Sequence, residues 1–576
     1  MNKIFRINMT DLTVKIEPVP EAWAGLGGRA LTSTIIAAEV PPTCHALGPN
    51  NKLVFAPGLL SGTAASNAGR FSCGSKSPLT GGIKECSAGG TSSRIIARLG
   101  IKAIIVEGQP AGDTWYSLIV GKDGVEFHAE TETLGMGTFE VVEKVTARLG
   151  EDFGVITLGQ AGEHLMAISN ISVKDPEGKI RSFGRGGLGA VMGSKKIKFI
   201  AVNPEGVANL PIVDNAKFKE ANRTFTKTLQ EHPVSGQGLK KYGTAVLVNI
   251  INEAGGLPTR NFTAGQCEHH DQISGEEMYD RIVARGGEPS HPCSPGCQIQ
   301  CSQVYNDKDG KYLTSGFEYE TLWALGADGM ITDLDVCAEI DNVFDDLGVD
   351  SIETPVMFAV AMEAGLLPWG DGKRMLEILH EDIAKGTPFG RMLGAGTAAV
   401  GRAYGLTRIP VVKNQAIPAY DPRAIKGIGV TYATTTMGAD HTAGYAIATN
   451  ILAVGGKVDP LSNDGQVELS RNLQIATAAV DSTGLCLFIA FPALDIPTCL
   501  PAVVDMLNAR YGISLTLDDV VALGKHVLKV EHEFNLAAGL GPETDRLPEF
   551  FELEPLTPHN VTWDMNPKEL ASFWSF

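Results

Sequence analysis

The 576-residue sequence is short of basic residues and has no long apolar run. Lys and Arg number 48 against 66 Asp and Glu, a net charge of −18. Proteins that bind nucleic acids or anionic membrane surfaces generally carry the opposite balance, so we expect neither as a partner. The most apolar stretch, residues 485–503, is interrupted by Asp495 and three prolines. A membrane-crossing helix needs about 18 apolar residues in a row, so we expect no membrane span.

The sequence also lacks the marks of a secreted protein. Its first residues contain no apolar stretch like that of a signal peptide, and a chain of this size does not need disulfides to hold its core. We therefore expect a cytoplasmic protein whose ten cysteines are reduced. In such a protein, clustered cysteines indicate metal binding. The 44% hydrophobic and 20% charged residues are typical of a folded globular protein.

Glycine is abundant, with 66 residues, but it has no fixed period, which excludes collagen. Many glycines stand in short runs within the first 200 residues. Such runs let the backbone approach another group closely. They indicate a large anionic or flat ligand.

Apolar spacing predicts an α+β protein with domains at residues 1–207, 208–410 and 411–576. The first domain is β-rich, beginning with a hairpin over residues 4–8 and 12–16. The other two are mainly helical. Further strands are predicted at 53–56, 103–106 and 197–202. Helices are predicted at 137–150, 218–229, 276–285, 334–347, 355–364, 373–384, 469–480 and 520–535.

Three cysteines in nine residues are the sharpest local signal, spaced Cys-x3-Cys-x3-Cys as Cys293, Cys297 and Cys301. Pro295 and Gly296 favour a loop around an ion, although buried cysteines also pack like small apolar residues. Zinc and iron–sulfur clusters both take four thiolates. The paired Cys-x2-Cys of structural zinc is missing, and the second gap is one residue too long for a radical S-adenosylmethionine enzyme. A cubane cluster would need a remote fourth thiolate, and the candidates are Cys267, Cys337, Cys486 and Cys499.

One short element occurs twice, as Asp-x-x-Gly-apolar-Asp/Cys, at residues 345–350 and 481–486. Both copies follow a predicted helix, so a glycine C-cap explains the pattern by itself. The second copy ends in Cys486, which would supply the fourth thiolate. The paired carboxylates could also accept hydrogen bonds from two similar ligands.

Residues 184–189 read Gly-Arg-Gly-Gly-Leu-Gly and match Gly-x-Gly-x-x-Gly. A dinucleotide fingerprint follows a strand and opens a helix, whereas residues 174–183 are polar and are not expected to form a hydrophobic strand. Arg185 beside consecutive glycine N–H groups still makes a phosphate cradle. The loops around Arg70, Lys76 and Ser87 repeat this chemistry, with ordinary surface loops as the alternative.

In order, these motifs resemble the aldehyde ferredoxin oxidoreductase family of tungsten enzymes. The likeness rests on Lys-Ser-Pro-Leu-Thr-Gly, the Gly-Arg-Gly-Gly loop, the cysteine triplet, Glu-Tyr-Glu-Thr, Ala-Asp-His-Thr and both Asp-x-x-Gly motifs. It runs through nearly the whole chain. One departure stands out: the usual triplet is Cys-x2-Cys-x3-Cys, and the extra residue here calls for a wider turn at Pro295-Gly296.

The resemblance implies a fold, cofactors and partners. Two β-sheets in the first domain would form a base for the cofactor, and two mainly helical domains would close over it. The cofactors would be tungsten (or molybdenum) held by two pterins, a [4Fe-4S] cluster, and Mg²⁺ joining the pterin phosphates. The substrate would be a small aldehyde, oxidised to a carboxylic acid. Electrons would pass to ferredoxin or to a small ferredoxin-like iron–sulfur subunit, in a homodimer or hetero-oligomer.

The resemblance also implies roles for individual residues. The cluster ligands would be Cys293, Cys297, Cys301 and Cys486. The cofactor-binding residues would be Arg70, Lys76, Ser87, Ala88, Gly89, Arg185, Gly186, Gly187, Asp345, Gly348, Asp350, Asp481, Gly484 and Leu485. Within that set, Asp345 and Asp350 would contact one pterin and Asp481 with Leu485 the other. Arg70 would bridge pterin and cluster.

Three residues would carry the chemistry. Glu320 matches the family's proposed general base, His441 a histidine near the metal that stabilises developing charge, and Tyr420 a tyrosine lining the pocket. Each has a structural alternative. Glu318 and Glu320 would favour the dipole of a helix start, His441 would be an N-terminal helix residue, and Tyr420 would serve packing.

Two rival functions remain. A dearomatising aryl-CoA reductase subunit of the same fold would use the same cofactors for reduction, with a cysteine ligand to the metal. Between the triplet and the third domain only Cys337 is available for that role. A non-catalytic iron–sulfur carrier would need the cysteines but neither Glu320 nor His441.

Overall fold

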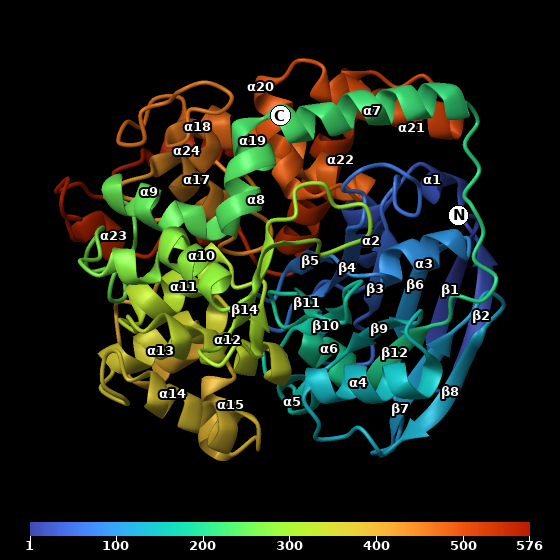
Figure 1. Ribbon diagram of the computed structural model, residues 1–576, viewed down its shortest axis with the longest axis horizontal. Helices are drawn as coiled ribbons and strands as arrows, with labels where there is room; N and C mark the ends of the chain where they lie inside the picture. Colours follow the sequence, from blue (N-terminus) through green and yellow to red (C-terminus); the bar gives the residue numbers. More distant parts are fainter.

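A computed structural model describes residues 1–576, and Figure 1 shows the sheets gathered on one side and the helices on the other. The first sheet has the order β2-β1-β6-β3-β4-β5 and the second β11-β10-β9-β12-β7-β8. The predicted α+β class and the opening hairpin are confirmed. The first sheet contains β1 (Lys3–Asn8), β2 (Thr13–Pro18), β3 (Leu53–Pro57), β4 (Phe71–Lys76), β5 (Ile83–Ala88) and β6 (Ile101–Glu107). The second contains β7 (Trp115–Val120), β8 (Val125–Glu130), β9 (Gly154–Thr157), β10 (Ile171–Lys174), β11 (Ile180–Phe183) and β12 (Ile197–Val202).

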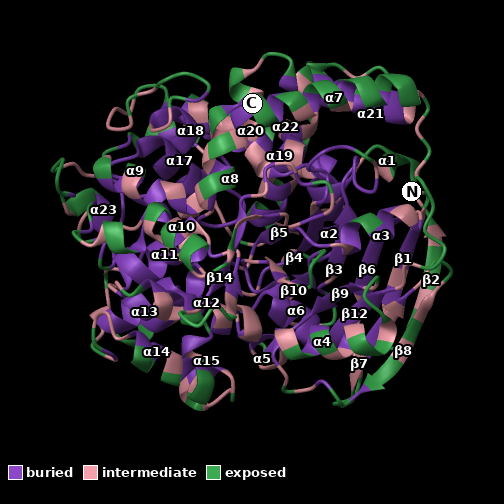
Figure 2. Cartoon of the chain, in the orientation of Figure 1, coloured by how far each residue is buried: buried purple, intermediate pink, exposed green.

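The two sheets pack face to face around a shared apolar core. Phe55, Phe71 and Phe183 meet there with ring centroids 5.7 to 5.8 Å apart. Because side chains alternate along a strand, Val54 points to the other face of the first sheet and packs under α2 (Gly28–Glu39). Helix α4 (Thr138–Leu149) covers the outer face of the second sheet in the same way. Figure 2 shows the central strands of both sheets fully buried.

The rest of the chain is mainly helical, as predicted. It begins with α7 (Asn215–Glu231), which packs on α21 across a core containing Phe218, Phe225 and Cys499. The first helix beyond residue 207 thus shares its core with the last third of the chain, as Figure 1 also shows. The other long helices are α10 (Gly275–Ala284), α12 (Leu334–Leu347), α13 (Glu353–Glu363), α17 (Lys426–Thr434), α19 (Gln466–Thr483), α21 (Cys499–Tyr511) and α22 (Leu517–Ala537).

Shorter elements complete the helical part. A small sheet of β13 (Glu288–His291), β14 (Ser302–Asn306) and β15 (Tyr312–Ser315) follows α10. The short helices are α9 (Leu247–Glu253), α11 (Tyr319–Trp323), α14 (Gly372–Ile378), α15 (Pro388–Leu393), α16 (Thr397–Ala403) and α20 (Ala490–Asp495). No single helix is long and apolar enough to cross a bilayer. The helical segments at residues 487–495 and 499–511 reach that length and apolar character only when taken together, and the chain bends by 119° between them.

Two sequence interpretations need correction. Residues 174–183 were expected to be polar and not to form a hydrophobic strand before the Gly-Arg-Gly-Gly loop, yet β11 precedes that loop and α6 (Leu188–Ser194) follows it. The reason is that β11 is an edge strand paired antiparallel to β10, with only Ile180 and Phe183 fully buried, while the polar Arg181 and Ser182 line a cavity. The helical alternative for His441 is also wrong, because His441 lies in the loop between α17 and α18 (Ile447–Asn450).

A buried ion pair fastens the sheet part to the last helices. Arg29 of α2 donates from Nε and Nη2 to Glu531 of α22 at 2.9 and 2.8 Å. Ser33 and Thr436 also donate to the same carboxylate. Glu531 has no exposed surface, and Arg29 is only 3% exposed. Arg29 Nη1 also lies 3.2 Å from Asp481. Loss of the Glu531 charge leaves the buried Arg29 with only that weaker partner, and loss of Arg29 leaves Glu531 without a counter-charge, so either change costs stability.

Replacing one partner of this pair therefore should destabilise the chain strongly. We expect Glu531→Gln to lower the free energy of unfolding by about 3 kcal/mol, since Arg29 keeps its charge in a buried site. Chemical denaturation monitored by circular dichroism measures the change. The matched control is Glu381→Gln, which removes an exposed partner of Lys385 and should leave the unfolding curve unchanged. Equal curves for the two variants would contradict the role of the pair.

Candidate active site

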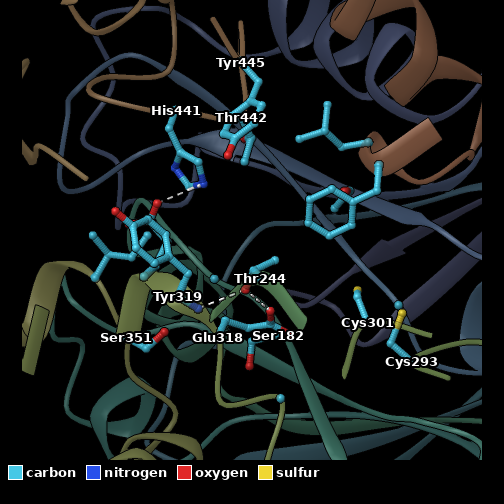
Figure 3. A pocket seen from close by; sticks show the side chains of 18 of the residues that line it. Ser182, Thr244, Cys293, Cys301, Glu318, Tyr319, Ser351, His441, Thr442 and Tyr445 are labelled. Atoms are coloured by element: carbon cyan, nitrogen blue, oxygen red, sulfur yellow. Dashed lines mark hydrogen bonds and ion pairs between the residues drawn. The ribbon is translucent and has the colours of Figure 1, made fainter. Parts of the chain in front are cut away.

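A cavity of about 600 Å³ lies where the sheets meet the helical part. Figure 3 shows His441 and Tyr445 at one side of it and Cys293 and Cys301 at another. The lining comes from all three predicted domains. Predicted site residues in the lining are Arg70, Ser87, Gly89, Arg185, Cys293, Cys301, Glu320, Asp345, Asp350, Tyr420, His441 and Asp481.

The two Asp-x-x-Gly motifs end α12 and α19, and each docks on the backbone of the sheet part. Gly348 and Gly484 both adopt left-handed C-cap conformations, at φ 68° and 84°, which favours glycine. Gly484 lies against Gly58, where an added Cβ would be 2.0 Å from the Gly484 nitrogen. The first motif lies against Gly159, where a Cβ would be 2.2 Å from the Leu347 carbonyl. These two early glycines therefore allow contact between protein backbones.

Backbone hydrogen bonds fix both motifs. Leu60 N–H donates to the Thr483 carbonyl at 2.7 Å, and Arg70 N–H donates to the Gly484 carbonyl at 3.0 Å. On the other motif, Asn170 N–H donates to the Gly348 carbonyl at 2.8 Å. Asp345, Asp350 and Asp481 are thereby held at the cavity wall.

Buried carboxyl groups with few counter-charges dominate the wall. Burial raises the pKa of Asp345 well above its ordinary value, with Asp341 adding to the effect. Burial likewise raises the pKa of Glu318 to about 7 and that of Glu85 to about 8. Perturbed acids gathered in one cavity are typical of functional sites. Protonated carboxyls both donate and accept hydrogen bonds, so this wall suits a polar ligand with ring N–H groups.

Arginines supply the positive charge of the cavity. Arg185 Nε donates to Asp350 at 3.0 Å, and its two terminal nitrogens donate to the Ala439 and Ala416 carbonyls. Arg70 Nη2 lies 3.6 Å from Cys486 Sγ. Arg185 thus links the glycine-rich loop after β11 to the segments that carry His441 and Tyr420.

The four predicted cysteines come together around Arg70. Hydrogen bonding to Cys297 and the charge of Arg70 lower the pKa of Cys293 well below its ordinary value. The hydrogen bond to Cys293 and burial raise the pKa of Cys297, and the nearby Cys301 and Cys486 raise it further. Of the remote candidates, only Cys486 is in this group.

The spacing of the sulfur atoms separates the metal alternatives. No three cysteine sulfurs lie within 4.8 Å of one another. Four thiolates on one zinc ion at about 2.3 Å would be only about 3.8 Å apart. The cysteine sulfurs as placed are therefore too far apart to bind a single zinc ion together.

Asn67 is a residue at this site that the sequence interpretation did not single out. Its side chain donates to Cys297 Sγ at 3.7 Å and accepts from Gln298 N–H at 2.8 Å. Its backbone donates to the Gly296 carbonyl and accepts from Cys486 N–H at 3.0 Å. With φ at 57°, Asn67 adopts a left-handed conformation that Asn tolerates well. The sequence Asn-Ala-Gly-Arg could have indicated this role, because Asn followed closely by Gly favours a tight turn.

Glu320 and His441 face each other at the opposite wall. Glu320 Oε1 lies 3.2 Å from His441 Nε2, and Glu320 Oε2 accepts from Ala419 N–H at 3.0 Å. Burial raises the pKa of Glu320 to about 8, and burial together with Arg185 lowers that of His441 to about 4. Neutral forms of both are therefore favoured near pH 7. Glu320 Oε1 and His441 Nδ1 have no hydrogen-bond partner within the chain, so both are available to a ligand.

Tyrosines build the floor beside this pair. Tyr420 O–H and Tyr445 O–H are 2.9 Å apart, and the Tyr420 ring centroid is 5.9 Å from that of His441. Tyr319 donates to the Ala419 carbonyl. Tyr445 and Arg181 also line the cavity. No sequence pattern marked those two, because tertiary packing alone brings them there.

Several predicted cofactor residues are near the cavity without lining it. Gly186 and Gly187 have φ of 81° and 76°, and Ser77 Oγ donates to the Gly186 carbonyl. Lys76 is placed elsewhere, at a second cavity of about 740 Å³ lined also by Cys44 and His45. The others outside the lining are Ala88, Gly348, Gly484, Leu485, Cys297 and Cys486.

Comparison with known proteins defines the class. Residues 4–204 match the family model for the N-terminal domain of aldehyde ferredoxin oxidoreductase, and residues 220–570 match that for its domains 2 and 3. The tungsten-containing aldehyde ferredoxin oxidoreductase of Pyrococcus furiosus is 36% identical over 96% of this chain and 92% of its own length. That of Thermococcus kodakarensis is 37% identical over the same shares. The chain belongs to the aldehyde ferredoxin oxidoreductase family, as its motifs predicted, and is an oxidoreductase of that class.

A solved structure supports the fold. The active-site complex BamBC of benzoyl coenzyme A reductase, with bound 1,5-dienoyl-CoA, has a chain that superposes with a TM-score of 0.80. It covers 100% of this chain and 93% of the other, at 17% identity. This likeness concerns the fold alone.

The raised pKa of Glu320 leads to a spectroscopic prediction. A protonated carboxyl has an infrared C=O band that the carboxylate lacks, so the protein at pH 6 to 7 should show that band from Glu320. Because the folded pKa is about 8, the band should fade as the pH rises through that value. Difference spectra between the unchanged protein and Glu320→Gln isolate it. The exposed Glu381→Gln change should give no such difference at these pH values, and a featureless Glu320 difference at pH 6 would contradict the assignment.

Proposed function

We propose that this chain oxidises aldehydes to carboxylic acids with a tungsten (or molybdenum) bis-pterin cofactor and passes the electrons through a [4Fe-4S] cluster to ferredoxin or a ferredoxin-like subunit. The observation that supports this proposal most is that residues of the Glu320–His441 pair, of the two docked aspartate motifs and of the cysteine group line one cavity. The relatives named as tungsten-containing aldehyde ferredoxin oxidoreductases support this choice, since they match almost the whole chain. Aldehyde plus water gives acid, two protons and two electrons.

The residues present fit these cofactors. Asp345 and Asp350 would hold one pterin, and Asp481 with Leu485 the other, through hydrogen bonds to ring nitrogens. The backbone at Ser87 and Gly186 would face the Mg²⁺ and phosphates. The wide cysteine group suits a cluster, with Arg70 between it and the cavity. When bound, the metal bis-pterin group supplies the two-electron redox chemistry.

The chain itself handles protons and orientation. Glu320 Oε1, with no partner in the chain, takes the proton of the attacking water. His441 in its neutral form donates a hydrogen bond to the substrate oxygen as charge develops there. Tyr420 and Tyr445 exclude water behind the pair. A pKa of about 8 places Glu320 close to working pH, so that it can both accept and return a proton.

Replacing Glu320 tests the base role. We expect Glu320→Gln to keep tungsten, molybdenum and iron contents unchanged and to lose about 100-fold or more in kcat, because general bases typically contribute that much. The rate of the unchanged enzyme should rise with pH through about 8 as Glu320 ionises. Anaerobic viologen reduction with a panel of aldehydes measures both.

The same assay separates the rival functions. Reduction driven by a cyclic dienoyl-CoA and by no aldehyde would favour the aryl-CoA reductase alternative and overturn our proposal. In the aryl-CoA reductase alternative a cysteine would bind the metal. Cys337 does not suit that role, because its thiol donates to the Ile331 carbonyl inside the helical core. Iron without tungsten or molybdenum in the purified protein would favour a simple electron carrier.

A matched pair of cysteine variants tests the cluster. Cys486 and Cys499 are both buried in the last third of the chain, and both were candidates for the fourth ligand. We expect Cys486→Ser to lower the iron content below about four per chain and to remove the cluster's visible absorption. Cys499→Ser should leave both unchanged. Iron loss in both variants, or in neither, would contradict the ligand set.

A further inference from the structure

His291 is a buried histidine outside the proposed reaction. It ends β13 and has no exposed surface. Its ring faces the turn between β10 and β11, so the contact joins the second sheet to the small sheet (Figure 1). His291, Asp175, Glu177 and Glu288 do not line the 600 Å³ cavity.

Asp175 fixes the orientation of the ring. His291 Nε2 lies 2.9 Å from Asp175 Oδ2, which also accepts from Arg181 at 3.1 Å. The other oxygen of Asp175 accepts from the backbone N–H groups of Glu177 and Lys179, each at 2.9 Å. A carboxylate so placed accepts a hydrogen bond from protonated Nε2, which leaves the lone pair of the neutral ring on Nδ1. A buried carboxylate behind a histidine is the usual support of a metal-binding imidazole.

The lone pair on Nδ1 faces two carboxylates. Nδ1 lies 3.3 Å from Glu177 Oε2 and 3.6 Å from Glu288 Oε2, and the three ligand atoms all lie within 4.8 Å of one another. Nδ1 is buried and has no hydrogen-bond partner. Three electron-rich atoms facing one point repel each other unless a cation lies between them.

The separations fit a metal ion in that place. Ligand atoms about 2.1 Å from a tetrahedral zinc ion are about 3.4 Å apart, which matches the two measured distances. A proton on Nδ1 would instead give a directed hydrogen bond, and neither carboxylate meets that geometry. One imidazole with two carboxylates is a donor set that suits zinc, with water completing the site.

We propose that His291, Glu177 and Glu288 bind one divalent zinc-like ion. The ion ties the β10–β11 turn to β13, two residues before Cys293, and so holds the start of the cysteine loop against the sheet part. This site is separate from the proposed catalytic cofactors.

Zinc binding by matched variants tests the proposal. The anaerobically purified holoprotein is first treated with a chelator. Zn²⁺ binding is then measured by equilibrium dialysis. The tungsten, molybdenum, iron and zinc contents of each sample are determined. The double variant Glu177→Gln/Glu288→Gln changes two partly exposed side chains, so folding should be retained. Glu126→Gln is the control, because it breaks an exposed Glu–His contact with His128 that has no third ligand.

The unchanged protein and the control should bind one more zinc per chain than the double variant, and each single Gln variant should bind zinc at least ten-fold more weakly. Zinc on other thiols is common to all samples and cancels in the difference. Substituting Mn²⁺ and recording pulsed electron paramagnetic resonance should show a histidine nitrogen coupling that His291→Gln removes. An equal zinc content in the unchanged protein and the double variant would overturn the proposal, whatever the aldehyde activity. It would identify His291 as a protonated histidine between carboxylates.

Discussion

The docking of two helix ends on the sheet part is the contact on which the site depends. Gly348 and Gly484 end α12 and α19, and Gly159 and Gly58 receive them without a side chain in between. Backbone hydrogen bonds at each junction are geometrically strict, so they fix the aspartates of both motifs relative to one another. A side chain at Gly58 would have to pass through the Gly484 backbone and would push the third part of the chain away from the cavity. The same displacement would separate Cys486 from the triplet, because Arg70 and Asn67 bond to the second motif and to Cys486.

The cavity this creates is an unusual electrostatic environment for an acidic protein. Its wall collects carboxyl groups that burial keeps neutral, and the fixed positive charge comes from a few arginines with defined partners. Arg185 is paired with Asp350, whereas Arg70 is directed at thiols. In the proposed reaction, a strongly anionic wall would repel the phosphate groups of the cofactor, and a fully cationic one would retain a carboxylate product. Neutral acids beside paired arginines would avoid both effects and would leave Glu320 able to exchange a proton.

Local signals in the sequence predicted many of the helices and strands, and the family resemblance predicted many of the residues that line the cavity. The hairpin, the α12 boundary and both glycine C-caps follow from residue spacing within about ten positions. The grouping of Cys486 rather than Cys499 with the triplet came from its motif and a family resemblance, because residue type alone does not distinguish two buried cysteines. The site residues that the sequence did not predict depend on tertiary contacts. Packing between distant segments determines the positions of Tyr445, Arg181 and the His291 group. The strand β11 was missed because an edge strand needs only two buried residues.

The extra residue in the cysteine triplet has a structural explanation. Relative to the Cys-x2-Cys spacing of the family pattern, the loop from Cys293 to Cys297 forms a wider turn, with Cys297 N–H donating to the Ser294 carbonyl at 3.2 Å and Gly296 at φ 82°. Asn67 N–H donates to the carbonyl at the top of that turn, and Gly69 leaves room for Ser294, whose hydroxyl would be 2.3 Å from an added Cβ. The longer turn is therefore not a bulge into solvent but a contact with the Gly-Arg loop. Because the same loop holds Arg70 beside Cys486, the longer turn connects the triplet to the remote cysteine.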